Sequence, residues 1–437
     1  MSAVQASAIR TPVRTRLITG GAMVVAGAAV FQAANFLFNT IAARMLGPAG
    51  YGDLAAVVGI IALSAPLFLS IQTVTSRTAT SLYAEGRARE LRGLARFYAL
   101  RLGFAAALLG VVAVLFSGPV AQVLNLRSSL PVALLGVIFV LSTETHLQRG
   151  VVQGLQRFGA FGLGSALEGV AKIVAVIVLV RYVWPTETGA IVALAFAGVC
   201  SLAFNGAILH GLPDTLERVR PIEHPYRYSV QTLGTLLLLA MLLSTDVIAA
   251  NRYFAAQTAG LYAAVSLSGK TVFFATSALT TFAFPVFSHR QDSGQDSRKA
   301  LFALLAVVAT CAAAVVGLYF IAPTILVNAI FGSQYTDAAE FVPWMAIAFA
   351  AYSIVYLVGM YLLSQRRRVG AAILGVAAVT QLAGFRFLHG GIPEFISVQL
   401  VVLTCTAAAL VAAAVIAGRR PARPSEEEDT EVLQWEP

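Results

Sequence analysis

Two lysines lie inside long apolar segments of this sequence, where a charge is costly. Lys270 is near the middle of the segment 258–288, and Lys172 lies in the segment 161–181. A cation at the centre of a bilayer costs about 2.5–3.5 kcal/mol, so such residues tend to face other helices or a wet cavity. Because Lys and Arg in low dielectric bind phosphate well, both lysines are candidates for holding an anionic substrate.

The same lysines also have a purely structural interpretation. Glu168 precedes Lys172 by four residues, which lets the two side chains pair on one face of a helix. Asp246, in the segment 229–250, could pair with Lys270 or with Arg252. Internal ion pairs of this kind would hold helices together without touching a substrate. The sequence leaves both interpretations open.

Three acidic residues are candidates for coupling transport to an ion gradient: Asp246, Glu168 and Glu144. A carboxylate inside a membrane can bind a cation or exchange a proton. Glu144 lies beside His146 near the predicted cytoplasmic end of its segment, where the alternative is that both side chains reach the interface.

Polar amides mark the first apolar segment. Asn35 and Asn39 are four residues apart, and Gln32 precedes them by one turn. On a helix these amides would share one face, where they could line a cavity or hydrogen-bond a neighbouring helix. We take Asn35 and Asn39 as further substrate-binding candidates.

The composition of the chain indicates that these residues lie on membrane helices. The chain is 58% hydrophobic and 12% charged with a mean hydropathy of +0.79, whereas a soluble domain carries about 25% charge. At about 20 residues per span, the sequence predicts an all-α membrane protein with twelve spans, at about 17–43, 53–76, 97–117, 131–149, 161–181, 188–210, 229–250, 258–288, 300–322, 341–363, 370–388 and 394–417.

The distribution of basic residues supports this topology. One set of alternate links holds 22 Lys and Arg, from Arg10 to Arg423 and including Arg77 and Arg149. The other set holds five: Arg44, Arg127, Arg181, Arg252 and Arg386. Positive charge accumulates on the cytoplasmic side. We therefore expect a multi-pass protein of the cell membrane with both termini in the cytoplasm, and basic loops rather than nucleic-acid binding as the reason for the pI near 9.7.

The chain also shows signs of an internal duplication. The link Arg44–Asp53 holds turn residues between the first two spans, and Ile41–Arg44 is echoed by Ile248–Asn251, as Ala49-Gly50 is by Ala259-Gly260. We expect two six-helix lobes: a cytoplasmic segment 1–16, an N-lobe 17–210, a linker 211–228, a C-lobe 229–417 and a disordered acidic tail 418–437. The first span follows basic residues but is too long for a signal peptide.

No pattern typical of an enzyme or a metal site is present. The sequence lacks HExxH, GxSxG and Walker A motifs, and Cys200, Cys311 and Cys405 stand singly in apolar segments. We therefore expect no catalytic residues, no cofactor and no metal.

Three stretches resemble the polysaccharide flippases, the Wzx-type branch of the multidrug/oligosaccharidyl-lipid/polysaccharide (MOP) superfamily. They are Ala43–Gly52, Gln153–Phe158, and Ala259–Tyr262 with Phe284–Ser288. The resemblance implies two lobes around a central cavity that opens to each side in turn. It also implies a polyprenyl-pyrophosphate-linked oligosaccharide as substrate, moved to the outer leaflet for cell-surface polysaccharide assembly.

The resemblance further implies that basic residues in the cavity hold the pyrophosphate. Lys270 is the best match, and Arg44 and Arg77 are weaker ones. Membrane lipids, a glycan polymerase or glycosyltransferases are the implied partners. The chain has fewer arginines for its cavity than the family often shows. Three alternatives stay open: an organic-cation exporter of the multidrug branch centred on Asp246, a non-transporting scaffold for glycan assembly, and a membrane glycosyltransferase or polymerase.

Overall fold

The computed structural model describes residues 13–211, 226–292, 298–365 and 367–417. Within these ranges the chain is helical apart from short links, as the composition predicts. The linker predicted at 211–228 and the tail at 418–437 lie almost wholly outside the described residues. The N-terminal half forms α2 (Val13–Ala84), α3 (Leu91–Leu115), α4 (Ser117–Val123), α5 (Leu130–Gly154), α6 (Phe158–Val178) and α7 (Glu187–His210). The C-terminal half forms α8 (Tyr226–Tyr253), α9 (Ala256–Asp292), α10 (Arg298–Ile321), α11 (Pro323–Phe331), α12 (Val342–Ser364), α13 (Arg368–Phe387) and α14 (Ile392–Ala417).

The predicted number of membrane spans agrees with these helices. Ten described helices are long and apolar enough to cross a membrane. The first of them contains two spans, because α2 reverses direction at Gly47, where φ is +69°. The 37-residue α9 adds another span and, as its long apolar segment predicts, extends well beyond 20 residues. The sequence-based boundaries differ from the helices by a few residues in most cases.

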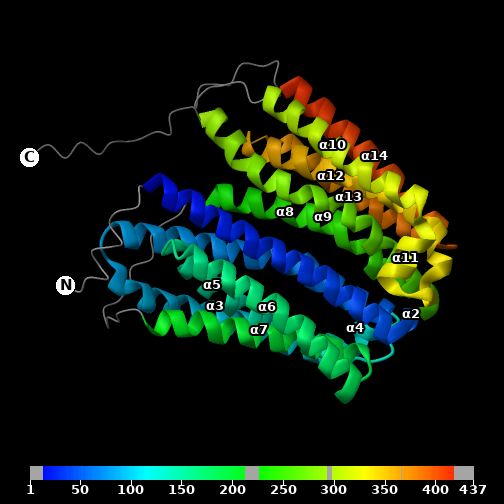
Figure 1. Cartoon of the computed structure of the whole chain (residues 1–437), viewed down its shortest axis with the longest axis horizontal. Helices are drawn as coiled ribbons and strands as arrows, with labels where there is room; N and C mark the ends of the chain where they lie inside the picture. Colours follow the sequence, from blue (N-terminus) through cyan, green and yellow to red (C-terminus); the bar gives the residue numbers. More distant parts are fainter. Residues whose placement is uncertain (1–12, 212–225, 293–297, 366, 418–437) are drawn as a thin grey trace, which may run out of the picture.

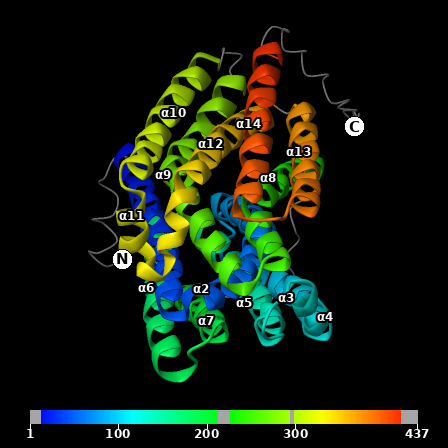
Figure 2. The ribbon, with the colours of Figure 1, turned by 90° about the vertical axis from the view of Figure 1, so that its right-hand side faces the viewer.

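The helices form two lobes, one from each half of the chain (Figures 1 and 2). α2 to α7 pack together as the N-lobe, and α8 to α14 as the C-lobe. Contacts of α2 with α8 and α9 join the lobes. This arrangement confirms the predicted architecture of two six-helix lobes.

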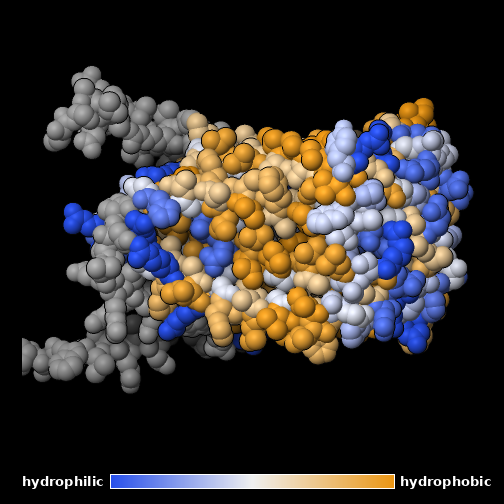
Figure 3. Space-filling model, turned by 90° about the horizontal axis from the view of Figure 1, so that it is seen from below, coloured by the Kyte–Doolittle hydropathy of each residue, from blue (hydrophilic) through white to orange (hydrophobic). Residues whose placement is uncertain are grey.

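The surface matches a membrane environment. Figure 3 shows a wide apolar band between two hydrophilic ends. Phe104, Leu115 and Ile321 are each more than 70% exposed, which is unfavourable in water but favourable in lipid. We call the end where α2 begins and α14 ends the basic end. We call the opposite end, at which α2 reverses direction, the distal end.

The distal end carries short helices that the sequence does not predict. α4 and α11 each follow a long helix, and the 3₁₀ segment η3 (Ser333–Phe341) follows α11. In the sequence they read as continuations of apolar segments or as links, because a helix of seven to nine residues is too short to show a clear period. α4 lies at the distal end of the N-lobe, and α11 lies at the distal end of the C-lobe.

Candidate functional site

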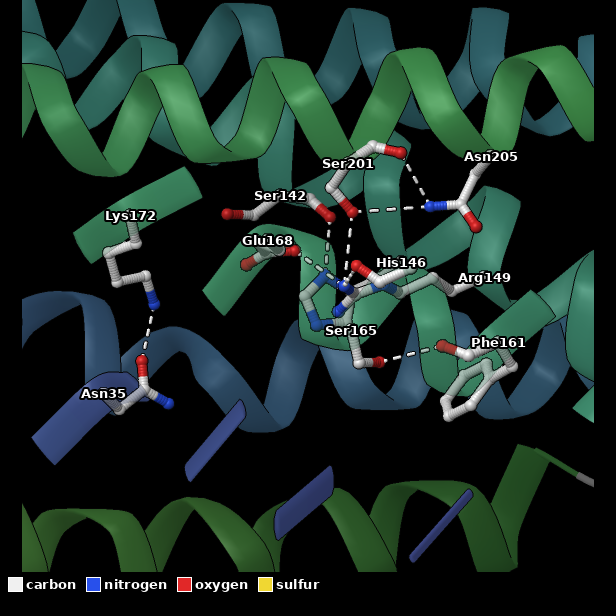
Figure 4. A network of polar contacts seen from close by, with 11 residues as sticks. Asn35, Ser142, His146, Arg149, Phe161, Ser165, Glu168, Lys172, Ser201 and Asn205 are labelled. Carbon is white, nitrogen blue, oxygen red and sulfur yellow. Dashed lines mark hydrogen bonds and ion pairs between the residues drawn. The ribbon is translucent and has the colours of Figure 1, made fainter. Parts of the chain in front are cut away.

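A polar network lies inside the N-lobe, centred on Arg149 of α5 (Figure 4). The Arg149 guanidinium is buried and donates from Nη2 to the carboxylate of Glu168 on α6 at 2.7 Å. It also donates to the hydroxyl of Ser201 on α7 at 3.2 Å, and Ser201 in turn accepts from Asn205. One arginine therefore ties together three helices of the lobe, by an ion pair to α6 and a hydrogen bond to α7.

The position of Arg149 corrects the sequence analysis in two ways. Arg149 is not in a cytoplasmic link, because α5 continues to Gly154, about one turn beyond the predicted segment. Glu168 pairs with this arginine and not with Lys172, although the i,i+4 spacing allowed that pair. The partner of Glu168 comes from another helix, which spacing within one segment cannot reveal.

Lys172 faces the first span instead. Its ammonium donates to the side-chain oxygen of Asn35 on α2 at 2.5 Å, and only 6% of the residue is exposed. The ring of Phe31 lies 4.7 Å from Lys172 Nζ and 5.8 Å from the Arg149 guanidinium carbon. Both distances suit cation–π attraction. Two cations and one carboxylate thus share this interior, which leaves a net positive charge.

Two side-chain atoms of the network retain hydrogen-bonding capacity. Nε of Arg149 and Oδ1 of Asn205 are buried and have no hydrogen-bond partner among the described residues. A buried polar atom without a partner is unfavourable. A ligand or water that reached these atoms would therefore be stabilised there.

Glycines bring α6 close enough to α2 for the Lys172–Asn35 contact. A Cβ on Gly162 would lie 2.5 Å from the Met23 carbonyl oxygen, and one on Gly169 would lie 2.7 Å from the Cβ of Ala34. Small residues at a helix interface allow the backbones to approach in this way. The glycines on α6 therefore help to bring Lys172 within hydrogen-bond distance of Asn35 on α2.

We expect Gly162→Val to lower the free energy of unfolding by about 2 kcal/mol, because overpacking costs about 1–3 kcal/mol. Gly317→Val is the matched control, since a Cβ there meets no atom within 4 Å. Thermal unfolding in detergent measures both variants. Equal stability of the two would contradict the close α2–α6 packing.

The C-lobe holds a buried ion pair of opposite charges. Lys270 of α9 donates to Asp246 of α8 at 3.1 Å, and Ser266 donates to the other carboxylate oxygen. Asp246 is fully buried, and Phe349 of α12 lies 5.6 Å from the ammonium. The pairing that the sequence left open as one alternative is therefore present, and the pair adds no net charge.

The remaining candidates lie elsewhere. Asn39 donates to the Asn35 carbonyl at 2.9 Å, within α2. Arg44 is at the distal end, where its guanidinium donates to carbonyls of the C-lobe, and Arg77 is exposed on the part of α2 that returns to the basic end. Glu144 lies against Gly103 of α3. The structure brings Asn35, Glu168 and Lys172 together and leaves these four outside that network.

A second ionic cluster lies at the distal end of the N-lobe. Arg127, in the link before α5, donates to Asp53 at 2.7 Å and to Glu187 at 3.4 Å. Burial lowers the pKa of Arg127, but the hydrogen bond to Asp53 and the charges of both acids outweigh burial and raise the pKa above its ordinary value. This arginine therefore stays charged and holds two buried carboxylates.

Sequence reasoning missed Arg149, Phe31, Ser201 and Asn205. Arg149 reads as a loop cation because it is the last residue of the apolar segment 131–149. Phe31, Ser201 and Asn205 are ordinary residues of membrane helices. The i,i+4 spacing of Ser201 and Asn205 was the one available signal for a polar stripe on α7.

Comparison with known proteins places the chain in a family. A family model described as "Polysaccharide biosynthesis protein" matches residues 41–340. A search of curated proteins finds no match.

Solved structures of transporters share the fold. An inward-facing multidrug resistance MATE family transporter of the MOP superfamily has a TM-score of 0.68 at 12% identity, covering 91% of this chain and 97% of that one. An outward-facing MATE family transporter of the MOP superfamily has a TM-score of 0.62 at 14% identity, covering 94% of this chain and 97% of that one. A MOP superfamily transporter from Pyrococcus furiosus, whose title describes a binding pocket of reverse polarity, has 0.57 at 12% identity, covering 94% and 98%. The chain belongs to the polysaccharide biosynthesis protein family and has the fold of MOP superfamily transporters.

Proposed function

We propose that this protein is a transporter that moves a polyprenyl-pyrophosphate-linked oligosaccharide from the inner to the outer leaflet of the cell membrane, by alternating access, for cell-surface polysaccharide biosynthesis. Both termini are then cytoplasmic, and the glycosyltransferases and polymerase of the same process are its partners. The family description supports the process, and the interior charge of the N-lobe supports an anionic head group.

The observation that carries the proposal is the charge balance around Lys172. Arg149 neutralises Glu168, so Lys172 has an amide oxygen as its acceptor instead of a carboxylate. A phosphate oxygen can take the place of that amide and gain a charge-assisted hydrogen bond. Arg149 Nε offers a second donor in the same interior.

The same geometry argues against an organic-cation exporter. Such a protein needs an unpaired carboxylate where its substrate binds. Asp246 is already paired with Lys270, and Glu168 with Arg149. Glu144 of α5 lies against Gly103 of α3, and α3 packs mainly on α5.

Mass spectrometry of polyprenyl-linked oligosaccharides in cells depleted of the protein tests the proposal. We expect one intact lipid-linked repeat to accumulate, because its transfer to the outer leaflet stops. Re-expression of the wild-type chain restores the pool. An unchanged lipid pool together with new sensitivity to cationic dyes would instead favour the drug exporter. An unchanged pool and unchanged dye sensitivity, with mislocalised glycan enzymes, would favour the scaffold.

A further inference from the structure

At the distal end, polar side chains of each lobe contact a short helix of the other lobe. Arg44, at the end of the first span of the N-lobe, donates from Nε to the carbonyl of Ile330 in α11 at 2.8 Å. Its Nη2 donates to the carbonyl of Ala329 as well and reaches that of Asn328 at 3.5 Å. The last turn of a C-lobe helix is thus capped by an N-lobe arginine.

The reciprocal contact is made by the C-lobe. Asn251, near the end of α8, donates to the carbonyl of Leu124 at 2.8 Å, and Arg252 donates to the carbonyl of Val123 at 3.2 Å. Val123 is the last residue of α4, and Leu124 is its C-cap. Each lobe therefore caps the carboxyl end of the other lobe's short distal helix.

Capping of this kind is favourable for two reasons. The last four carbonyls of a helix have no donor within the helix, so they need partners from elsewhere. The helix dipole also places partial negative charge at that end, which attracts Arg44 and Arg252. If the lobes separated at the distal end, both helices would lose these donors at once.

The backbone packing between the caps is tight. A Cβ on Gly260 of α9 would clash with the carbonyl of Pro48, and one on Gly52 would lie 2.9 Å from the amide nitrogen of Gly260. The Tyr335 hydroxyl donates to the carbonyl of Ala43 at 3.0 Å. The two hairpins that begin the lobes thus meet directly at the distal end.

The two caps lie at corresponding positions of the echoed stretches of the sequence. Ile41–Arg44 and Ile248–Asn251 occupy the end of the first span in their lobes. Arg44 and Asn251 are the last residues of the two echoed stretches, and each donates across the interface. Each echoed stretch therefore supplies one donor to the contact between the lobes.

We propose that these reciprocal helix caps form a two-part lock that holds the distal end closed, and that the distal end opens only when both parts are released. The inference rests on contacts between the lobes and does not depend on the substrate assigned above. It predicts that removing either cap shifts the closed-to-open ratio by about tenfold, and removing both shifts it by about a hundredfold, because the two caps are separate and their effects add.

Distances between spin labels on the full-length protein test the lock. Cys200, Cys311 and Cys405 are first replaced by alanine. Labels at Ser129→Cys and Asp337→Cys, both exposed, report on the distal end. Labels at Tyr83→Cys and Val369→Cys, also exposed, report on the basic end. The labelled protein without its native cysteines is the reference. It is compared with three variants, namely Arg44→Ala, Asn251→Ala with Arg252→Ala, and all three changes together.

With all three changes we expect a new population of longer distances at the distal pair and shorter distances at the basic pair. Arg386→Ala is the matched control, because this distal arginine is exposed and lies by Phe387 of its own helix. It should leave both distributions unchanged. Should the triple variant fail to fold, Arg44→Ala is combined with Asn251→Asp, which turns a donor into a charge facing Asp53, and this pair of changes is expected to open the distal end. Unchanged distances in the folded triple variant, or in Arg44→Ala combined with Asn251→Asp, would overturn the lock, as would an equal shift in Arg386→Ala.

Discussion

Lys172→Ala is expected to lower transport at least about tenfold while the protein still reaches the membrane. A hydrogen bond to a charged group contributes about 1.5–3 kcal/mol, and each 1.4 kcal/mol is a factor of ten. Lys172 is the interior cation of the N-lobe whose acceptor is a neutral amide, so a phosphate oxygen can compete for it. Accumulation of lipid-linked oligosaccharide, measured by mass spectrometry, reports the loss.

Two variants separate the charge of Lys172 from its packing. Lys172→Arg keeps the charge and should retain part of the activity. Arg101→Ala removes a cation from another span, but Arg101 is exposed on α3 and lies over Phe97, so transport should stay near the wild-type level. Full transport by Lys172→Ala would remove this residue from the site and leave the charge argument for an anionic substrate without support.

Breaking the Lys270–Asp246 pair is expected to destabilise the C-lobe by about 3–5 kcal/mol, because removing one partner leaves a buried charge without compensation. Both Lys270→Met and Asp246→Asn should show this loss in thermal unfolding. The double variant should recover most of it, since two neutral side chains of similar volume need no mutual charge. The pair is suited to this test because Asp246 is fully buried and the two groups come from neighbouring helices.

Transport by the double variant then distinguishes two roles for Lys270. If Lys270 only stabilises the lobe, the double variant, whose stability is restored, transports normally. If it also contacts the pyrophosphate, as the family resemblance implies, the double variant is stable but inactive. Stability that stays low in the double variant would contradict a simple ion pair.

The sequence by itself determined the membrane architecture. Long apolar segments must become helices in lipid because backbone polar groups have no other partners there, and the alternation of basic links fixes their number. The segment 258–288 already predicted one unusually long helix, and α9 is that helix. The echo of Ile41–Arg44 in Ile248–Asn251 already indicated a division into two halves, and each half forms one lobe.

The partners of the buried charges were decided by tertiary structure alone. Glu168 is four residues from Lys172, yet it binds Arg149 from another helix, while Lys172 binds Asn35. Likewise, nothing in the sequence around Arg44 indicates that it caps α11. Hydropathy depends on what each segment contains, so it can be read locally. Ion pairing and capping depend on how helices rotate and pack, and that is set by contacts between residues far apart in the chain, such as Gly162 against Met23.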